Sequence, residues 1–531
     1  MDIVDKGTCM TTASRSASTE SDRLASVLAT PDAYPDPTTH VECRETHISR
    51  VFLTDQFAYK QKKPVRFEFL DFSTCDLRRQ ACLAELQLNR RLAPDVYLEV
   101  LPITQSADGS FHLGDRGNIV DSLVKMRRLN DADTLLAAIQ QQRVDSAQID
   151  SLANLLADFY RRQAPLAMTA DEYRRRIEQR IRNNLAELLS DEHQFPSHEI
   201  RRIHSAQLVF LALNPQIFDA RVAAGRIVDG HGDLRPEHVY LTSPPAIIDC
   251  IEFNAEFRQI DVLDELAFLE SECALMQAEE VGYAIRERCA QLLNDHPPKE
   301  LAAFHKSFRA CVRAKVACLR ARQLPQAMAG EQIRIARKYL DLADQFDEVL
   351  GPPLLLVVGG ASGTGKSTIA HALAERLGIE VLQTDKIRQG LVDAGHLPSD
   401  NRDAKYESQN RERVYDAMLA AADQLLQQHS SVILDGTFLN HKHRRQVAAL
   451  ADRHHARWLI IRCECPLEVA QNRIASRLQS GNSLSEAIPD LVEKQLAADE
   501  QDDPSWPVIT CDTSHPAVIA VREIIERLRA L

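Results

Sequence analysis

The first hydrophobic pattern in the chain is an alternation of apolar and polar residues, as expected for β-strands. It runs from His47 to Thr54 and from Phe57 to Lys62, and the polar residues 54–56 between these segments predict a hairpin turn. From Asp76 to Leu92 the apolar residues recur at helical spacing, which predicts a helix. The chain therefore begins with a lobe built of strands and a helix.

A long helical pattern follows, from Leu129 to about Leu350. It is interrupted between Ile227 and Asn254, where short apolar runs alternate with His, Gly, Asp and Pro residues. Loops on a rigid scaffold present reactive groups, so we expect the chemistry of this part of the chain in the interruption.

A different pattern begins after the helix-breaking sequence Gly351–Pro353. Short apolar segments alternate there with helical ones, which predicts an α/β domain with a parallel sheet covered by helices. The apolar segments are Leu354–Val358, Val432–Leu434, Trp458–Ile461 and Val508–Thr510. We therefore expect a flexible leader at residues 1–35, an α+β domain with a largely helical second lobe at residues 36–350, and the α/β domain at residues 351–531.

The composition and charge exclude several classes of protein. The chain has 531 residues, 44% of them hydrophobic, which suffices for two or three globular domains. Its net charge of −13 argues against nonspecific nucleic-acid binding, and its longest aliphatic run, Leu354–Val358, is too short to cross a membrane. No secretory signal is recognisable and the 12 Cys are scattered, so we expect a cytoplasmic protein without structural zinc or disulfides.

The clearest chemical motif follows the first apolar segment of the α/β domain. It matches the phosphate-loop pattern of P-loop NTPases, and a helical segment comes directly after it. In such a loop the backbone amides surround phosphates, Lys366 reaches the β- and γ-phosphates, and Ser367 binds magnesium. We expect ATP and Mg²⁺ to be bound here by Gly360, Ala361, Ser362, Gly363, Thr364, Gly365, Lys366, Ser367 and Thr368.

Two carboxylates follow further strands of this domain. The sequence from Asp385 to Arg388 resembles the Asp-x-x-Arg element of polynucleotide kinases, zeta-toxin kinases and related small P-loop kinases. This resemblance covers roughly residues 353–531, and implies that Asp385 is the general base for an acceptor hydroxyl and Arg388 binds an anionic group of the substrate. The alternative is a helix-capping Asp and a solvated Arg. Asp435 ends the next strand, as a Walker B carboxylate does, and there either holds magnesium or binds the acceptor.

Two arginines, Arg473 and Arg477, lie one helical turn apart downstream of these carboxylates and precede a polar stretch at residues 479–485. In the resembling families, arginines at this place form a lid over the γ-phosphate. A solvated pair on a helix face is the alternative.

The interruption of the helical pattern contains the sequence from His231 to His238, followed by Asp249 at the end of an apolar segment. Two aspartates on neighbouring loops suit phosphoryl transfer, in which one orients the acceptor hydroxyl and the other holds magnesium. The sequence is similar to the aminoglycoside-phosphotransferase and protein-kinase-like superfamily, and to a bacterial group that fuses such a domain to a P-loop domain. The resemblance implies that Asp233 is catalytic, Asp249 binds metal, and His238 stands at a metal-binding Asn position.

The same resemblance extends to the first lobe. The segment ending in Lys60 is similar to the strand that carries the phosphate-binding lysine, which implies that Glu85 is the ion-pair partner of this lysine and that Val124–Met126 contact adenine. Lys62 has the same strand parity as Lys60 and is an alternative to it. Around Asp249, Glu252 and the following charged residues are interpreted as a structural network.

The leading hypothesis is a bifunctional kinase that transfers the γ-phosphoryl group of ATP to a hydroxyl of a small acceptor. The alternative is a regulatory nucleotide-binding protein, with a pseudokinase sensor and a P-loop ATPase switch, which the imidazole of His238 favours because it prefers softer metals than magnesium. A third interpretation makes the P-loop domain a toxin-like sugar-nucleotide kinase. The sequence does not identify the acceptor, including whether it is an aminoglycoside, nor the oligomeric state.

Overall fold

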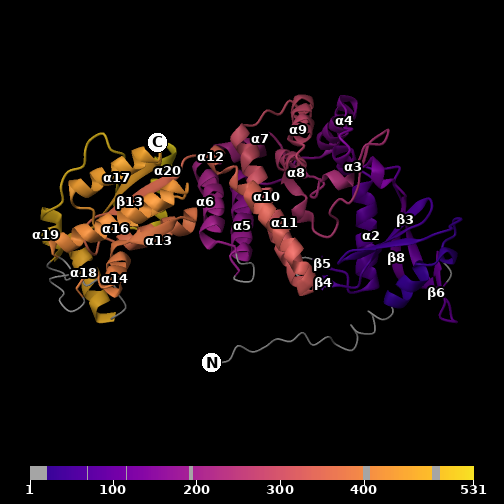
Figure 1. Ribbon diagram of the computed structural model, residues 1–531, viewed down its shortest axis with the longest axis horizontal. Coiled ribbons are helices and arrows are strands. Elements are labelled where there is room, and N and C mark those ends of the chain that lie inside the picture. Colours follow the sequence, from indigo (N-terminus) through magenta and orange to yellow (C-terminus); the bar gives the residue numbers. More distant parts are fainter. Residues whose placement is uncertain (1–20, 68–69, 115–116, 191–194, 399–406, 481–490) are drawn as a thin grey trace. The chain divides into compact units, whose positions relative to one another are not determined.

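The computed structural model describes residues 21–67, 70–114, 117–190, 195–398, 407–480 and 491–531 (Figure 1). The chain forms two compact units, each from two stretches of sequence. Unit 1 consists of Met1–Ala167 and Ala224–Pro297, and unit 2 of Met168–Ala223 and Pro298–Leu531.

Unit 1 begins with an antiparallel sheet in the order β1-β2-β3-β8-β6-β7. Its strands β3, β8 and β6 are labelled in the indigo part of Figure 1. Helix α2 (Cys75–Asn89) packs on one face of it, where Ala58 and Cys82 are buried together. Side chains alternate along β3, so Lys60 and Lys62 share this face with Ala58, whereas Tyr59 lies in the core on the other face. The strands are β1 (Glu42–Glu45), β2 (Ser49–Leu53), β3 (Phe57–Lys62), β6 (Tyr97–Gln105), β7 (Phe111–Leu113) and β8 (Asn118–Arg127), with a short hairpin of β4 (Arg66–Phe67) and β5 (Leu70–Asp71).

The described part of the predicted leader belongs to this lobe. Residues 21–28 are helical, and Leu24, Leu28 and Tyr34 are buried in one cluster with Tyr59. The sequence pattern did not reveal this, because a short helix with few apolar positions has no periodicity of its own to distinguish it from a flexible end. Residues 1–20 lie outside the described chain.

The second part of unit 1 is largely helical. Two short strand pairs, β9 with β12 and β10 with β11, interrupt the helices. Strands β9, β10 and β11 lie in the segment where the sequence pattern breaks, and β12 follows that segment. Leu152, Leu234 and Leu266 share a buried cluster, so the loops between the strand pairs are held on the helices. The elements are α3 (Leu135–Gln140), α4 (Ser146–Arg162), β9 (Ile227–Asp229), η4 (Pro236–His238), β10 (Val239–Tyr240), β11 (Ala246–Ile247), β12 (Gln259–Asp261), α8 (Val262–Leu275) and α9 (Glu279–Leu293).

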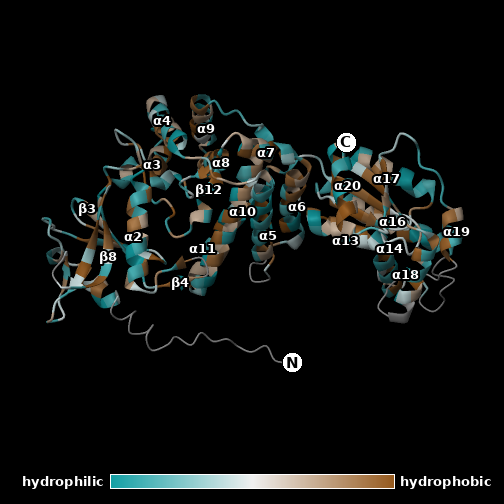
Figure 2. Ribbon diagram, turned by 180° about the vertical axis from the view of Figure 1, so that it is seen from behind, coloured by the Kyte–Doolittle hydropathy of each residue, from teal (hydrophilic) through white to brown (hydrophobic). Residues whose placement is uncertain are grey.

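Unit 2 contains a parallel sheet in the order β14-β15-β13-β16-β17, so the predicted parallel sheet is confirmed. Its central strand β13 is buried along its whole length, which explains why the sequence shows an unbroken apolar run there. Figure 2 shows the hydrophobic colour concentrated on these strands. The strands are β13 (Leu354–Gly359), β14 (Glu380–Gln383), β15 (Val432–Asp435), β16 (Arg457–Glu464) and β17 (Val508–Asp512).

Helices cover both faces of this sheet. One face packs against α13, α20 and α6, and the other against α16 and α17. Because all neighbouring strands are parallel, their carboxyl ends meet at one edge, and the loops that follow them converge there. The helices of this part are α13 (Lys366–Leu377), α14 (Thr384–Asp393), α16 (Ser408–Gln427), α17 (His441–Arg453), α18 (Leu467–Ser480), α19 (Leu491–Ala497) and α20 (Ala517–Arg529).

The remaining helices of unit 2 come from the region that the sequence pattern assigns to the first domain. Val209, Ala212 and Leu213 of α6 are buried in one cluster with Leu354 and Leu356 of the parallel sheet. The compact units therefore do not follow the predicted boundary at residue 351. The sequence of an amphipathic helix shows that one face is apolar, but it does not determine against which hydrophobic core this face packs. These helices are α5 (Ala170–Leu188), α6 (Ser197–Leu213), α7 (Pro215–Ala223), α10 (Lys299–Gln323), α11 (Gln326–Asp344) and α12 (Asp347–Leu350).

None of the helices in the described chain is both long enough and apolar enough to cross a membrane.

Candidate functional site

The phosphate loop connects β13 to α13 in unit 2, and its backbone requires glycine. Gly360 and Gly363 have φ values of 131° and 82°, which disfavour other residues. A Cβ atom on Gly363 would lie 2.5 Å from the carbonyl oxygen of Ala470, and one on Gly360 would lie 2.4 Å from that of Cys463. The loop is therefore a compact turn packed against its neighbours, and ends at the first residue of α13, Lys366.

Lys366 lies against this loop, and its Nζ donates to the carbonyl oxygen of Ala361 at 2.8 Å. Burial lowers the pKa of Lys366, an effect that the negative charge of Asp435 partly opposes. Ser367 and Thr368 follow in the first turn of α13 and are exposed. The N-terminus of α13, the ammonium group of Lys366 and the hydroxyl of Ser367 thus lie together. Such a set of groups can bind a phosphate together with its metal cation.

The carboxylates predicted near the loop lie at the carboxyl edge of the parallel sheet. Asp435 and Gln383 are register partners at the ends of β15 and β14, and Val358, the last but one residue of β13, is the partner of Asp435 on its other side. Asp435 is 4% exposed, and its Oδ2 accepts a hydrogen bond of 2.9 Å from Gln383 Nε2. Sequence reasoning missed Gln383 as the partner of Asp435, because this contact depends on the strand register.

Asp385 lies in the first turn of α14, directly after β14. Arg388 is one turn further and donates from Nη1 to Asp385 Oδ1 at 2.5 Å. The side chain of Arg388 is 13% exposed and that of Asp385 35% exposed. The pair is thus half-buried near the loop, and Arg388 orients the carboxylate that was predicted as the general base.

Arg473 of α18 is connected to the loop through Thr513. It donates from Nη2 to the carbonyl oxygen of Thr513 at 2.8 Å, and the hydroxyl of Thr513 donates to the carbonyl oxygen of Thr364 at 2.6 Å. Arg477 is exposed and donates to the carbonyl oxygen of Arg473 at 3.3 Å. Arg473 therefore lies beside the loop, and Thr513 is a contact that the sequence did not indicate. The side chains of the predicted polar stretch at residues 479–485 lie outside the described residues.

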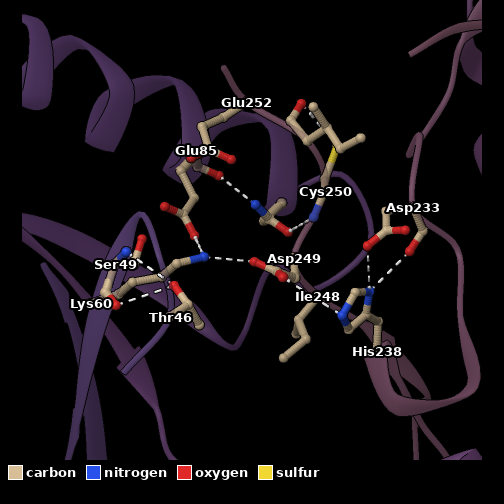
Figure 3. Close-up of polar contacts among 12 residues, drawn as sticks. Thr46, Ser49, Lys60, Glu85, Asp233, His238, Ile248, Asp249, Cys250 and Glu252 are labelled. Atoms are coloured by element: carbon tan, nitrogen blue, oxygen red, sulfur yellow. Dashed lines mark hydrogen bonds and ion pairs between the residues drawn. The ribbon is translucent and has the colours of Figure 1, made fainter. Parts of the chain in front are cut away.

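The candidate residues of unit 1 form a second cluster, in which Lys60 lies between two carboxylates (Figure 3). Its Nζ lies 2.7 Å from Oε1 of Glu85 on α2, and 2.6 Å from Oδ1 of Asp249. Asp249 follows β11 and has a φ of 65°, in the left-handed region that few residues other than Gly, Asn and Asp adopt. Loss of hydration raises the pKa of Asp249, but Lys60, His238 and Lys62 together lower it by more, so the net pKa lies well below its usual value.

Lys62 occupies a different environment from Lys60. Its side chain is 0% exposed, and its Nζ contacts Oε1 of Glu252 and lies 2.5 Å from Oε2 of Glu85. Lys60 is 13% exposed and faces Asp249, which is 45% exposed. Lys62 is therefore enclosed by buried carboxylates, whereas Lys60 borders the accessible part of the cluster.

His238 lies between the two predicted aspartates. Its Nδ1 donates to the main-chain carbonyl of Asp233 at 2.9 Å, and its Nε2 lies 3.6 Å from Oδ2 of Asp249 (Figure 3). Arg235 donates to Asp233 Oδ2 at 3.1 Å and to His238 Nε2 at 3.2 Å. The structure thus brings Asp233, His238 and Asp249 together with Lys60, and adds Arg235, which sequence reasoning did not assign to the site.

The loop that carries Asp233 is fixed by a buried carboxylate. Glu265 of α8 accepts from the main-chain amides of His231 and Gly232, the former at 2.9 Å, and from the hydroxyl of Tyr160 at 2.7 Å. Burial lowers the pKa of His231, whose Nε2 donates to the carbonyl of Ile248 at 2.9 Å. No sequence pattern indicated Glu265, because an acidic residue within an apolar helix has no motif around it.

Other charged residues of this region contact neighbouring side chains and the backbone of the loops. Arg258 donates to the carboxylate of Asp229 and to the carbonyl of Ile251, both at 2.7 Å, and Asp261 accepts from the amide of Leu263 at the start of α8. These contacts hold the loops around Asp249 in place.

Magnesium ligands were predicted in both units. Among the residues that the structure describes, no three His, Cys, Asp or Glu side chains converge as a metal site. Magnesium usually binds to one or two carboxylates together with substrate phosphates and water, so Asp249 in unit 1, and Ser367 with Asp435 in unit 2, fit that kind of site.

A family model and one kinase of known activity agree with a P-loop kinase-like domain in unit 2. A family model described as an AAA domain matches residues 355–501. The 2-phosphoglycerate kinase of Methanocaldococcus jannaschii is 33% identical over 126 residues, which are 20% of this chain and 40% of that protein. Among solved structures, a gluconokinase from Sinorhizobium meliloti 1021 aligns with a TM-score of 0.25 and 20% identity, covering 34% of this chain and 93% of that one.

Longer matches come from mycobacteria. The uncharacterized protein Rv2004c of Mycobacterium tuberculosis is 34% identical over 450 residues, which are 83% of this chain and 87% of that protein. The uncharacterized protein Mb2027c of Mycobacterium bovis matches with the same identity and coverage. The match extends well beyond the P-loop domain, and this chain belongs to the same protein family as Rv2004c.

Proposed function

We propose that the protein is an ATP-dependent phosphotransferase, in which unit 2 transfers the γ-phosphoryl group of ATP to a hydroxyl of a small molecule. The observation that carries the proposal is the convergence of three groups at one edge of the parallel sheet. These are the phosphate loop, the buried Asp435, and the ion pair of Asp385 with Arg388. Loops at the carboxyl ends of parallel strands are where such folds bind their ligands.

Each group has a role in this reaction. The loop amides and Lys366 would bind the phosphates, and Ser367 with Asp435 would hold the magnesium that neutralises their charge. Asp385 would accept the proton of the acceptor hydroxyl as the new phosphorus–oxygen bond forms and the bond to the β-phosphate oxygen breaks, releasing ADP. Arg473, which is held beside the loop through Thr513, would stabilise negative charge on the transferred group.

Arg388 points to the acceptor class. Arginine binds carboxylates and phosphates through a planar set of donors, and Arg388 lies beside the carboxylate proposed as the base. We propose that the acceptor carries an anionic group near its hydroxyl. The similarity of this part of the chain to a 2-phosphoglycerate kinase supports this class.

Unit 1 would be a second phosphotransferase site, of the aminoglycoside-phosphotransferase and protein-kinase-like kind. The contacts of Lys60 with Glu85 and Asp249 support this proposal, because they join a sheet lysine, a helix glutamate and the aspartate that we propose as the metal ligand. Asp233 would then orient the acceptor hydroxyl, and Val124–Met126 on β8 would contact adenine.

A specific observation favours the alternative for unit 1, a nucleotide sensor without transfer activity. Asp233 is paired with Arg235, and His238 lies between Asp233 and Asp249 in place of a metal ligand. A catalytic base needs access to the proton of its substrate. Asp385 of unit 2 has Arg388 beside it, whereas Asp233 has both Arg235 and His238 beside it.

One set of assays tests both sites. Magnesium-dependent ATP turnover is measured for the whole protein, for Lys366→Ala and for Asp233→Asn, against nucleosides, sugars, phosphorylated hydroxy acids and aminoglycosides. We expect Lys366→Ala to abolish transfer to an anionic acceptor. A remaining activity that disappears in Asp233→Asn would establish the second site. Full transfer by Lys366→Ala on every acceptor would refute the proposal for unit 2.

A further inference from the structure

The phosphate loop has one side-chain contact that the proposed mechanism does not use. The main-chain amide of Ser362, inside the loop, donates to Oε1 of Gln495 at 2.7 Å. Gln495 belongs to α19, more than a hundred residues further along the chain, and is half-buried. Amides of a phosphate loop are the groups that bind phosphate, so a side chain that contacts one of them lies at the binding surface.

The contact lies at the part of the loop that meets the terminal phosphates. Ser362 N and Ala361 O belong to the same peptide unit, and Ala361 O accepts from Lys366 Nζ at 2.8 Å. Lys366 and Gln495 therefore hold the two sides of one peptide. Because the lysine of a phosphate loop reaches the β- and γ-phosphates, Gln495 lies beside the place where these phosphates bind.

Two anchors hold α19 in this position. Val492 is fully buried in a cluster with Ala361, Ala470 and Ile474, so the helix packs on the loop itself. On the other side of Gln495, the segment that follows α19 is held by arginines of α17 and β16.

The second anchor consists of ion pairs and backbone contacts. Arg444 is 2% exposed and lies 2.7 Å from Oδ1 of Asp502, while Arg462 lies 2.6 Å from Oδ2 of the same carboxylate. The amide of Glu500 also donates to the carbonyl of Leu439 at 3.0 Å. Gln495 is thus placed by a fixed support, as a residue that positions a reacting group must be.

We propose that Gln495 recognises the γ-phosphate of the nucleotide bound to unit 2. The oxygen of its side-chain amide accepts from Ser362, so the NH₂ group on the same carbon atom is left to donate to an oxygen of the terminal phosphate. ADP lacks this phosphate and forms no such bond. Gln495 therefore makes the loop prefer ATP to ADP and orients the group that is transferred. The inference rests on nucleotide binding by unit 2 as proposed above.

Two substitutions separate donation to phosphate from support of the loop. Gln495→Ala removes both bonds of the side chain. Gln495→Glu keeps an oxygen that accepts from Ser362, but it has no N–H to donate and adds a negative charge beside the phosphates. Leu496→Ala, at the exposed neighbouring position of α19, is the matched control.

Binding of ADP and of a non-hydrolysable ATP analogue is measured by calorimetry with magnesium, using the whole protein. Binding to unit 2 is defined as the part that Lys366→Ala removes. We expect Gln495→Ala to weaken analogue binding about tenfold and to leave ADP binding unchanged, since a hydrogen bond to a charged group has this effect. The loss in Gln495→Glu should be larger, and Leu496→Ala should match the wild type.

An unchanged ratio of analogue to ADP affinity in both Gln495 variants would overturn the inference, as would tighter binding of both ligands, which would mean that the side chain merely occupies the amide. These results would leave the proposed transfer activity intact. Conversely, a protein that prefers the ATP analogue through Gln495 but transfers phosphate to no acceptor would support the inference and refute the proposed function.

Discussion

The most informative perturbation in unit 1 is Lys62→Met, because two lysines of β3 are candidates for the same role. Lys62 is fully buried between Glu85 and Glu252, which are 0% and 5% exposed. Methionine has a similar volume but no charge, so the substitution leaves two buried carboxylates with one fewer partner. Removing one member of a buried ion pair costs about 3–5 kcal/mol.

For a domain of this size, a loss of that magnitude lowers the melting temperature by on the order of 10 °C. Lys60→Met should cost less, because Asp249 is 45% exposed and becomes hydrated, while Glu85 keeps Lys62. The effects on nucleotide binding should have the opposite order, with the larger loss in Lys60→Met. Lys60→Met should remove nucleotide binding by unit 1 if this unit binds ATP.

The two Trp residues of the chain make the assay specific. Trp458 and Trp506 both lie in unit 2, so tryptophan fluorescence follows the unfolding of unit 2 alone, whereas far-ultraviolet circular dichroism follows both units. Lys62→Met should lower the midpoint temperature of a transition seen by circular dichroism and leave the midpoint temperature seen by fluorescence unchanged.

Lys63→Met is the matched control, because Lys63 directly follows the same strand and pairs with Glu45, which is 51% exposed. A surface pair contributes less than about 1 kcal/mol. The double variant Lys62→Met/Glu252→Gln should have a free energy of unfolding more than about 1 kcal/mol higher than that of Lys62→Met alone, as expected for two residues whose energies are coupled. The reasoning is refuted if Lys62→Met and Lys63→Met melt at the same temperature.

Further predictions concern unit 2. Arg444→Met should lower the free energy of unfolding followed by tryptophan fluorescence by about 1–3 kcal/mol, because it removes the buried donor to the carbonyl oxygen of Glu500 and one of the arginine partners of Asp502, which keeps Arg462; an unchanged midpoint in urea would contradict this. Burial raises the pKa of Asp347 to about 7, although Arg202 opposes the shift, so the folded state holds this proton longer than the unfolded chain. Stability should therefore rise by about 1.4 kcal/mol from pH 8 to pH 6, and Asp347→Asn should remove that part of the pH dependence. Asp385→Asn should reduce the turnover number about 10²–10⁴-fold while the KM for ATP stays the same, and a changed KM with unchanged turnover would exclude a role as base.

The sequence by itself determined the local elements and the motifs that they carry. Strand β13 was recognisable because both of its faces are buried, and the phosphate loop because each of its glycines has a steric reason. The strands β2 and β3 and helix α2 were found within a few residues of their ends, because period and burial agree in them. Strand β6 was missed, since its mixed burial pattern does not alternate.

The tertiary structure alone decided which distant residues meet. Lys60 and Asp249 are 189 residues apart, and only the docking of the strand-pair loops against the sheet of unit 1 brings them together. The same is true of α6, whose apolar face packs against the parallel sheet of unit 2, and of Gln495, which has no motif around it. Periodicity is a property of neighbours along the chain, whereas these contacts arise from the packing of whole elements, which no local pattern encodes.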